Sequence, residues 1–122
     1  MPVIPPFLLK QLYVKGSLQA IDNGVQFVLH NILANATVLG LRVSIDSREV
    51  PAEAMQVSLN GETSLPVAQI TPEAPFRFPM SSKATISASG LPPIAPGPHS
   101  LEISPSTREI GEVTISVEDS LA

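Results

Sequence analysis

The chain has 122 residues, with 13 prolines, 7 glycines, no cysteine and a net charge of −4. A chain of this length fits one domain of about 100–150 residues, and so much proline argues against a helical protein, because an interior proline costs a helix about 3 kcal/mol. The lack of cysteine excludes disulfides, thiolate metal sites and cysteine nucleophiles, and seven dispersed Lys and Arg residues offer no basic patch to nucleic acid or an anionic membrane.

The chain begins with an apolar, proline-rich segment over residues 1–10. Prolines interrupt its apolar stretch, no basic n-region precedes it and no small-residue cleavage site follows, so it does not have the form of a signal peptide. No run in the sequence reaches the ~18–20 apolar residues of a membrane span. We therefore expect a cytoplasmic protein in which residues 1–10 form an extended arm, packed on a neighbour or mobile, ahead of one domain over residues 11–122.

Most of the remaining sequence alternates between apolar and polar residues. This period of two, with many β-branched residues, is typical of half-buried antiparallel strands. The side chains expected to point inward are Val25, Phe27 and Leu29; Leu39, Leu41, Val43 and Ile45; Val57 and Leu59; Ala84, Ile86 and Ala88; Leu101 and Ile103; and Val113, Ile115 and Val117.

Turn residues separate these strands at regular intervals. Asp22-Asn23-Gly24 lies between strands expected near 11–19 and 25–30, and Asn60-Gly61 is the strongest two-residue hairpin signal. Asp46-Ser47 is a weaker turn, Gly90–Gly97 is a proline-rich connection, and Pro66–Ser82 is expected to cross from one sheet to the other. About eight or nine short strands with turns every ~8–12 residues predict an all-β fold, a single-domain antiparallel β-sandwich that is immunoglobulin- or fibronectin-like in the broad sense.

The polar residues do not form a recognisable catalytic or metal-binding motif. There is no GxSxG elbow, no Gly-rich phosphate loop, and no HxH or HExxH spacing. We therefore predict no catalytic, cofactor-binding or metal-binding residue in this chain, and we expect its carboxylates to be solvated at turns and strand ends. The histidines His30 and His99 leave a small metal-dependent hydrolase as a remote alternative. The carboxylates in question are Asp46, Glu49, Glu53, Glu118 and Asp119.

The segment Pro75–Met80 is the most informative one for binding. In an extended chain Phe76 and Phe78 point to the same side and Arg77 to the other, so the two rings are either core residues or anchors for a partner protein. The apolar arm offers a second candidate contact. The candidate partner-interface residues are Phe7, Leu8, Phe76, Arg77, Phe78 and Met80.

Three stretches resemble the small β subunit of bacterial C-glycoside deglycosidases. Val14-Lys-Gly-Ser-Leu18, followed by the Asn23-Gly24 turn and a strand containing Phe27, is similar to the start of those subunits. Val43-Ser-Ile-Asp46 with Glu49-Val-Pro51 resembles their third strand and turn. Ile94–Ile103, with its Pro-Gly-Pro-His element, resembles their penultimate strand.

The resemblance implies an accessory role. In that family the small β-sandwich accompanies a larger TIM-barrel-like subunit, which carries the divalent metal and the catalytic histidine and cleaves the carbon–carbon bond of 3-oxo-C-glycosides. This chain would then need no cofactor of its own and would belong to a hetero-oligomer. It departs from the family at His30–Thr37, where many members have a Tyr-Tyr-Arg-Gly-like segment, so contacts of that loop are not transferred. The alternative is a stand-alone immunoglobulin-like binding or structural module without enzymatic role.

Overall fold

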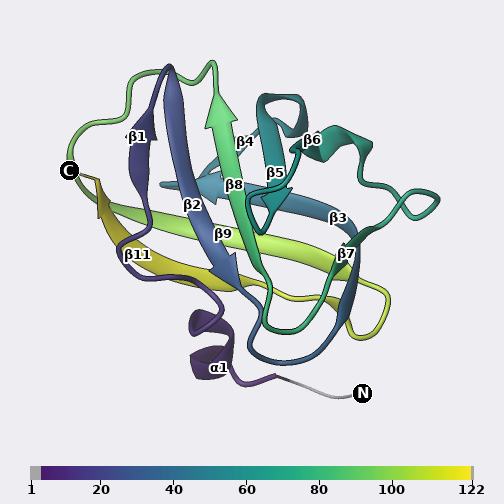
Figure 1. Cartoon of the computed structure of the whole chain (residues 1–122). Helices are drawn as coiled ribbons and strands as arrows, with labels where there is room; N and C mark the ends of the chain where they lie inside the picture. Colours follow the sequence, from purple (N-terminus) through teal and green to yellow (C-terminus); the bar gives the residue numbers. More distant parts are fainter. Residues whose placement is uncertain (1–3, 122) are drawn as a thin grey trace.

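The computed structural model describes residues 4–121, which form two antiparallel β-sheets packed on each other (Figure 1). The all-β fold is as predicted. The first sheet has the strand order β1-β2-β8-β5-β6. Its strands are Gln19–Ile21 (β1), Gly24–His30 (β2), Lys83–Ser89 (β8), Met55–Leu59 (β5) and Leu65–Pro66 (β6).

The second sheet is built around two long strands that pair along most of their length. In it β9 pairs with β3, β10 and β11, and β3 pairs in addition with β4 and β7. Its strands are Ala36–Ile45 (β3), Arg48–Val50 (β4), Phe76–Phe78 (β7), Gly97–Thr107 (β9), Gly111–Glu112 (β10) and Ile115–Leu121 (β11).

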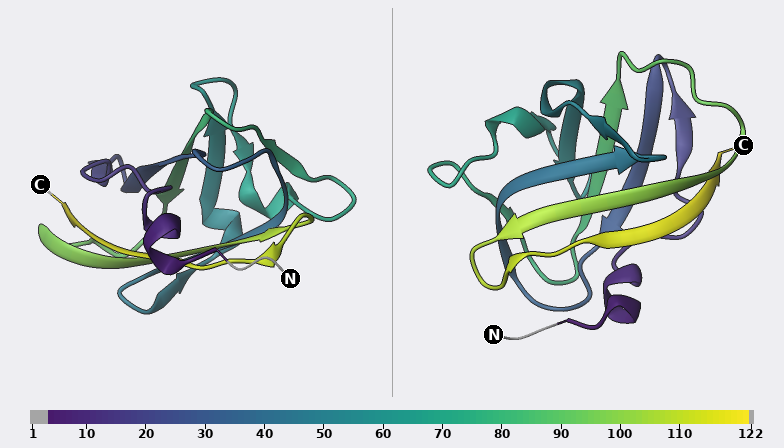
Figure 2. Two further views of the ribbon diagram at one scale, coloured as in Figure 1. Left: turned by 90° about the horizontal axis from the view of Figure 1, so that it is seen from below. Right: turned by 180° about the vertical axis from the view of Figure 1, so that it is seen from behind.

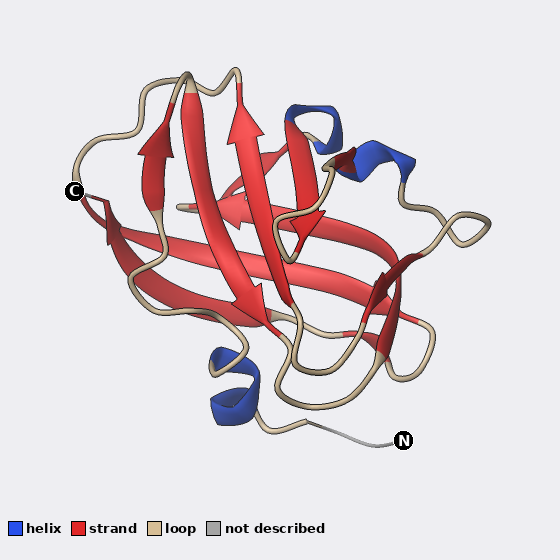
Figure 3. Cartoon of the chain, in the orientation of Figure 1, coloured by secondary structure: helices blue, strands red, loops and turns tan. Residues whose placement is uncertain are grey.

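Helical structure is confined to short pieces (Figure 3). Besides α1 at Pro6–Lys10, the described residues contain two single 3₁₀ turns, η1 at Ala52–Ala54 and η2 at Val67–Gln69. None of the helices in residues 4–121 is long and apolar enough to cross a membrane.

The strand order of the two sheets is immunoglobulin-like, but the angle at which the sheets pack is not. The order β1-β2-β8-β5 in one sheet and β4-β3-β9-β11 in the other is the order in which strands A-B-E-D and C-F-G pair in immunoglobulin domains. The strands of the two sheets, however, run across each other in Figure 1, whereas immunoglobulin sheets pack with their strands nearly aligned. The closer immunoglobulin or fibronectin assignment therefore stays a prediction.

The core lies between the two sheets and follows the predicted alternation closely. Val25, Phe27 and Leu29 of β2 are buried, and so are Ala84, Ile86 and Ala88 of β8 beside them. The second sheet adds four large aliphatic side chains that are fully buried. These are Val43 of β3, Leu101 and Ile103 of β9, and Ile115 of β11.

The prediction that Leu39 points inward is wrong. The pairing of β3 with β9 shifts register between Val38 and Gly40, and such a bulge moves every preceding side chain to the opposite face. Val38 is therefore buried, whereas Leu39 is only half-buried, and the expected alternation resumes at Leu41 and Val43.

The predicted turns are confirmed where they join neighbouring strands. Asn60 and Gly61 have φ values of 51° and 78° and join β5 to β6, and Asp46 and Ser47, at 51° and 68°, join β3 to β4. Consecutive positive φ angles are those of the two-residue turn that matches the twist of a hairpin. The segment Pro66–Ser82 reaches the second sheet at β7, but the strands at its two ends, β6 and β8, both lie in the first sheet. The predicted crossing therefore occurs, but the chain returns to the sheet that it left.

The start of the chain differs from the prediction in two ways. The extended arm is wrong for Pro6–Lys10, which form α1, and Leu9 of this helix is buried in the core. Residues 1–3 of the arm lie outside the described residues. The prediction of a strand near 11–19 is also wrong for most of that range. Residues 11–18 form turns, with one bridge between Tyr13 and Leu29, and β1 begins only at Gln19. The domain boundary after residue 10 stays a prediction.

Candidate functional site

The most apolar hollow described in the molecule is a cavity of about 190 Å³ between the sheets. Side chains from both sheets form its walls, among them Leu29 and Ile86 on one side and Val38 and Ile115 on the other. It reaches the end of the sandwich where α1 and the loop over residues 31–35 lie, which is seen from below in the left view of Figure 2. We call this end of the molecule, formed by α1, residues 31–35, β7 and residues 79–81, the open end.

The exposed large apolar side chains of the described residues are all at the open end. They are Phe7 of α1, 64% exposed, Ile32, 40% exposed, and Met80, 53% exposed. Isolated apolar residues on a surface are ordinary, whereas apolar residues that form a contiguous patch mark an interaction surface. The grouping favours a contact with another apolar surface.

β7 places its residues as the sequence predicted. It pairs with β3, with Phe76 opposite Val38 and Phe78 opposite Ala36, so both rings face the cavity and Arg77 is exposed on the other side. The ring centroids are 6.3 Å apart at an interplanar angle of 48°. Both rings are half-buried against the core, which makes them neither fully core residues nor free surface anchors.

The candidate interface residues of the arm, Phe7 and Leu8, lie on α1, whose side chains face partly the core and partly the surface. Leu9 packs into the core, Leu8 is half-buried and Phe7 points outward. Met80 follows β7 and is held in place by its backbone N–H, which donates to the Asn35 side-chain oxygen at 2.9 Å. The structure thus brings five of the six candidate interface residues to the open end as apolar side chains, with Arg77 facing away.

The Asn31 side chain holds the segments of the open end together by hydrogen bonds. This residue was not among those predicted from the sequence. Its amide nitrogen donates to the carbonyl oxygens of Ala34 and Phe78, at 2.8 Å each, and its oxygen accepts from the Leu33 backbone N–H at 3.1 Å. It is 4% exposed. An asparagine can satisfy several backbone groups at once, and here one side chain joins the 31–35 loop to β7.

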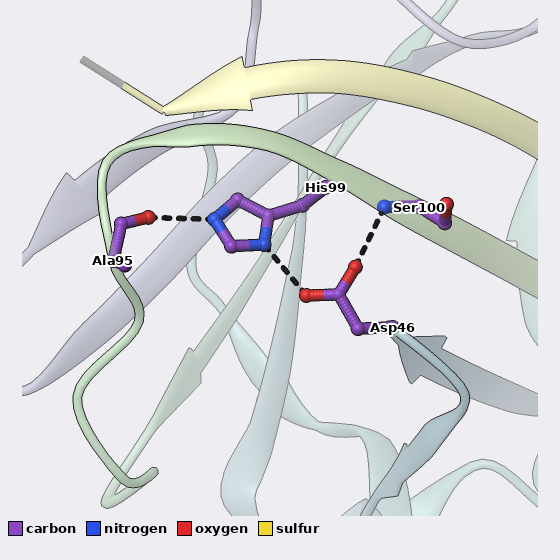
Figure 4. A network of polar contacts seen from close by, with 4 residues as sticks. All are labelled: Asp46, Ala95, His99 and Ser100. Carbon is purple, nitrogen blue, oxygen red and sulfur yellow. Dashed lines mark hydrogen bonds and ion pairs between the residues drawn. The ribbon is translucent and has the colours of Figure 1, made fainter.

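A second feature is a polar network between the β3–β4 turn and the start of β9 (Figure 4). The Nδ1 atom of His99 lies 2.6 Å from Oδ2 of Asp46, and its Nε2 atom lies 2.6 Å from the Ala95 carbonyl oxygen. The other oxygen of Asp46 accepts from the Ser100 backbone N–H at 2.9 Å. A carboxylate and a carbonyl only accept hydrogen bonds, so both ring nitrogens donate and His99 is an imidazolium ion.

Asp46 and His99 each shift the pKa of the other in the direction that favours its charged form. The hydrogen bond from His99, followed by that from the Ser100 backbone, lowers the pKa of Asp46. The hydrogen bond to Asp46, followed by that to the Ala95 carbonyl, raises the pKa of His99 above its usual range. The network fastens the proline-rich Gly90–Gly97 loop to the β3–β4 turn.

In this geometry His99 presents no free ring nitrogen to a metal ion. Both ring nitrogens of His99 are engaged by protein acceptors, and a metal needs a nitrogen with a free lone pair. Within residues 4–121, no group of three or more His, Asp or Glu side chains lies together in a way that could hold a metal ion. His30 ends β2, and its backbone N–H donates to the Leu12 carbonyl oxygen at 2.7 Å.

Asp119 corrects the prediction that the carboxylates are solvated. It is 5% exposed, and its Oδ2 atom accepts from the Tyr13 hydroxyl at 2.6 Å and from the backbone N–H groups of Gly16 and Leu18 at 3.0 and 3.2 Å. Burial alone would raise its pKa, but the donors, Tyr13 foremost, outweigh burial and lower the pKa. Asp119 therefore fixes the turns of residues 13–18 onto the last strand, which is a structural role.

Comparison with known proteins gives one family. A family model described as "Hydroxymethylglutaryl-CoA reductase, N-terminal domain" matches residues 8–122. No curated protein matches the sequence. Among solved structures, the chain is similar to one from a study of glycolipid glycan hydrolysis by a family 123 glycoside hydrolase from Clostridium perfringens, with a TM-score of 0.39 and 12% identity, over 80% of this chain and 20% of that chain. The chain spans a fifth of that hydrolase, and a likeness of this size carries no argument.

Proposed function

We propose that this chain, which belongs to the family described as hydroxymethylglutaryl-CoA reductase, N-terminal domain, is a non-catalytic accessory β-sandwich that binds a larger catalytic protein through its open end. The observation that carries the proposal is that the exposed residues Phe7, Ile32 and Met80 lie on α1, the 31–35 loop and the segment after β7. The same parts of the open end supply the cavity-lining residues Leu9, Leu33 and, at the end of β7, Phe78. Burial of such a cluster against a partner removes apolar area from water at about 25 cal/mol per Å².

The composition of the open end suits a protein partner. Phe and Met are enriched in the buried centres of protein interfaces, where charged residues are rare. Phe76 and Phe78, half-buried against the core, would add apolar area to the contact from the cavity side. Anchors of this kind carry most of the binding energy of an interface.

The first candidate for the catalytic partner follows from the sequence resemblance. It is the metal-dependent barrel subunit of a C-glycoside deglycosidase-like complex, which cleaves the carbon–carbon bond of 3-oxo-C-glycosides. Under this proposal the divalent metal belongs to the partner, and this chain shapes or stabilises the mouth of its active site. The cytoplasmic location and the hetero-oligomeric state expected from the sequence are part of the same proposal.

The second candidate follows from the family match over residues 8–122. The family description names hydroxymethylglutaryl-CoA reductase, so the catalytic partner or neighbouring domain would reduce hydroxymethylglutaryl-CoA. In this case too the reaction would take place outside the chain, because its sequence carries no Gly-rich dinucleotide-binding motif.

The decisive experiment is affinity purification of the tagged chain from its native host, with mass spectrometry of proteins that co-purify at fixed stoichiometry. The complex is then assayed for cleavage of a 3-oxo-C-glycoside with added divalent metal and for reduction of hydroxymethylglutaryl-CoA. The active assay identifies the partner class. A chain that elutes as a monomer without a stoichiometric companion overturns the accessory role and leaves the stand-alone module.

A double variant localises the contact. Phe7→Ser with Met80→Ser should leave the isolated fold unchanged, because both side chains are exposed, and should abolish co-purification. Pro92→Ser is the matched control: it also changes an exposed apolar side chain, but in the Gly90–Gly97 loop beside the His99 network rather than at the open end. Equal co-purification of the double variant and wild type would exclude the open end as the interface.

A further inference from the structure

We propose that the apolar cavity between the two sheets is a binding site for a small neutral molecule built on a single aromatic ring. This inference goes beyond the partner contact, since it concerns the cavity inside the sandwich rather than the exposed side chains outside it. Phe76 and Phe78 belong to both, so the test uses the chain without a partner. It rests on the size of the cavity, the engagement of its polar side chains, the charge at its mouth and the phenylalanine pair in its wall.

The volume sets the size of the ligand. The cavity holds about 190 Å³, whereas well-packed protein interiors leave few voids larger than a water molecule. A dry engineered cavity of roughly 150 Å³ lined by Leu, Ile and Phe binds benzene. The present cavity has the same kind of lining and slightly more room, which fits a benzene ring with one or two small substituents.

The polar side chains in the lining are already engaged within the protein. Asn31 bonds to the backbone of its own loop and of β7, and Asn35 accepts from the Met80 N–H. The Thr107 hydroxyl donates to the Gly111 carbonyl and accepts from the Ile110 N–H, and Glu109 accepts from the Thr37 N–H and hydroxyl, both at 2.8 Å. Of these four side chains, only Asn35 has an amide nitrogen that is not engaged by these bonds, so a polar ligand would replace few of the hydrogen bonds that it makes to water.

The charge of the lining excludes anionic ligands. Glu109 is an exposed residue at the edge of the lining. The hydrogen bonds from the backbone and side chain of Thr37 lower the pKa of its carboxylate, so it stays ionised at neutral pH. No Lys, Arg or His is among the described residues that line the cavity. A fatty-acid carboxylate or a phosphate ester would meet repulsion without a compensating cation.

The phenylalanine pair favours an aromatic ligand over an alkane. Phe76 and Phe78 stand 6.3 Å apart at an angle of 48°, and both face the cavity. A third ring beside such a tilted pair gains edge-to-face contacts that a saturated chain does not.

The test uses p-xylene as the probe and the whole chain as the protein. We expect saturating p-xylene to raise the Tm and to shift the amide resonances of cavity residues, while cyclohexane binds more weakly and laurate does not bind. Absence of any shift with p-xylene, or tighter binding of laurate, would overturn the proposal.

Two cavity-filling variants test whether p-xylene binds in this cavity. Ala84→Leu adds volume from the buried wall, and Val113→Phe does so from a half-buried lining position; each should weaken p-xylene binding at least tenfold. Val117→Phe is the matched control, since Val117 is also half-buried but does not line this cavity, and its binding should equal that of wild type. If Ala84→Leu fails to fold, Val113→Phe decides, and undiminished binding by a folded filling variant contradicts the assignment.

Discussion

The imidazolium of His99 lies between Asp46 and the Ala95 carbonyl, with 2.6 Å on each side. Asp46 belongs to the turn after β3, and Ala95 to the loop before β9, so one side chain ties together two segments about fifty residues apart. The ring is mostly shielded, with 11% of the His99 side chain exposed, whereas 49% of the Asp46 side chain is exposed.

The stability of the protein should therefore fall as the pH rises through the pKa of folded His99. That pKa is raised above the ordinary value of about 6.5, so folding favours the protonated ring. The stabilisation is fully present below the unfolded pKa and is lost as the folded ring deprotonates. Asp46 has a lowered pKa, so its part is present above its ordinary value of about 3.9 and is lost in stronger acid.

Urea unfolding of wild type and His99→Gln between pH 5 and 9 measures this effect. The two proteins should differ most in free energy of unfolding near pH 5–6 and converge at alkaline pH. His30→Gln is the matched control, because it removes the other histidine and leaves the Asp46 pair intact, so the wild-type pH dependence should persist. A constant difference between wild type and His99→Gln across the range would show that protonation of His99 is not linked to folding.

Removal of the Asp119 carboxylate should strongly destabilise the fold. Asp119→Ala leaves the buried Tyr13 hydroxyl and the Leu18 N–H without their acceptor, and each unsatisfied buried group costs about 1–3 kcal/mol. We expect a loss of roughly 2–4 kcal/mol in the free energy of unfolding. Because the pKa of Asp119 is lowered, wild type should also lose this stabilisation as the pH falls through the folded pKa.

Glu118→Ala is the control for this prediction. Glu118 is the exposed neighbour on β11, and the contact it makes with Lys15 uses its backbone carbonyl oxygen. Its truncation should change stability by no more than about 0.5 kcal/mol. Similar losses for the two variants in equilibrium unfolding would mean that the buried network contributes nothing specific.

The sequence predicted what depends on neighbours along the chain. Alternation placed Phe27 and Ile86 on the buried faces of adjacent strands, and the hairpin residues Asn60 and Gly61 adopt the positive φ angles that such turns need. Alternation failed at Leu39 because a bulge adds a residue without changing the local composition. Helix α1 was not predicted because a helix of five residues is too short to show a helical period in the sequence.

Contacts between distant segments were not predictable in the same way. Asp119 meets Tyr13 across 106 positions, and His99 meets Asp46 across 53. No local pattern distinguishes a buried carboxylate from a solvated one, and the prediction of solvated carboxylates was wrong for Asp119 for that reason. The phenylalanines of β7 were placed on one face correctly, but their half-buried position depends on the open cavity, which no sequence pattern shows.

The three phenylalanines that face inward should respond differently to truncation. Phe27 is 2% exposed, so Phe27→Ala should cost about 3–5 kcal/mol in the free energy of unfolding. Phe76 and Phe78 are half-buried beside an existing cavity, so their alanine variants should cost roughly half as much. If the proposed partner binds at the open end, the same two variants should weaken its binding by about 2 kcal/mol, measured by calorimetry. A Phe78→Ala loss as large as that of Phe27→Ala would identify Phe78 as a core residue only.

Gly24 should be the glycine at which a methyl group is tolerated least. A Cβ atom placed on it would lie 1.7 Å from the Ala88 carbonyl oxygen, a backbone atom held in the β2–β8 pairing. Accommodation would require the two strands to separate at this point, and overpacking of this kind costs about 1–3 kcal/mol or more. We therefore expect Gly24→Ala to lower the Tm by several degrees.

Gly40 supplies the comparison, because it also lies in a strand and a Cβ there would meet no atom within 4 Å. Gly40→Ala should leave the Tm unchanged or raise it slightly, since alanine restricts the unfolded chain more than glycine does. Thermal unfolding of the two variants side by side separates the steric effect from the general effect of losing a glycine. Equal tolerance at both positions would mean that β2 and β8 do not approach each other at Gly24 as closely as the structure has them.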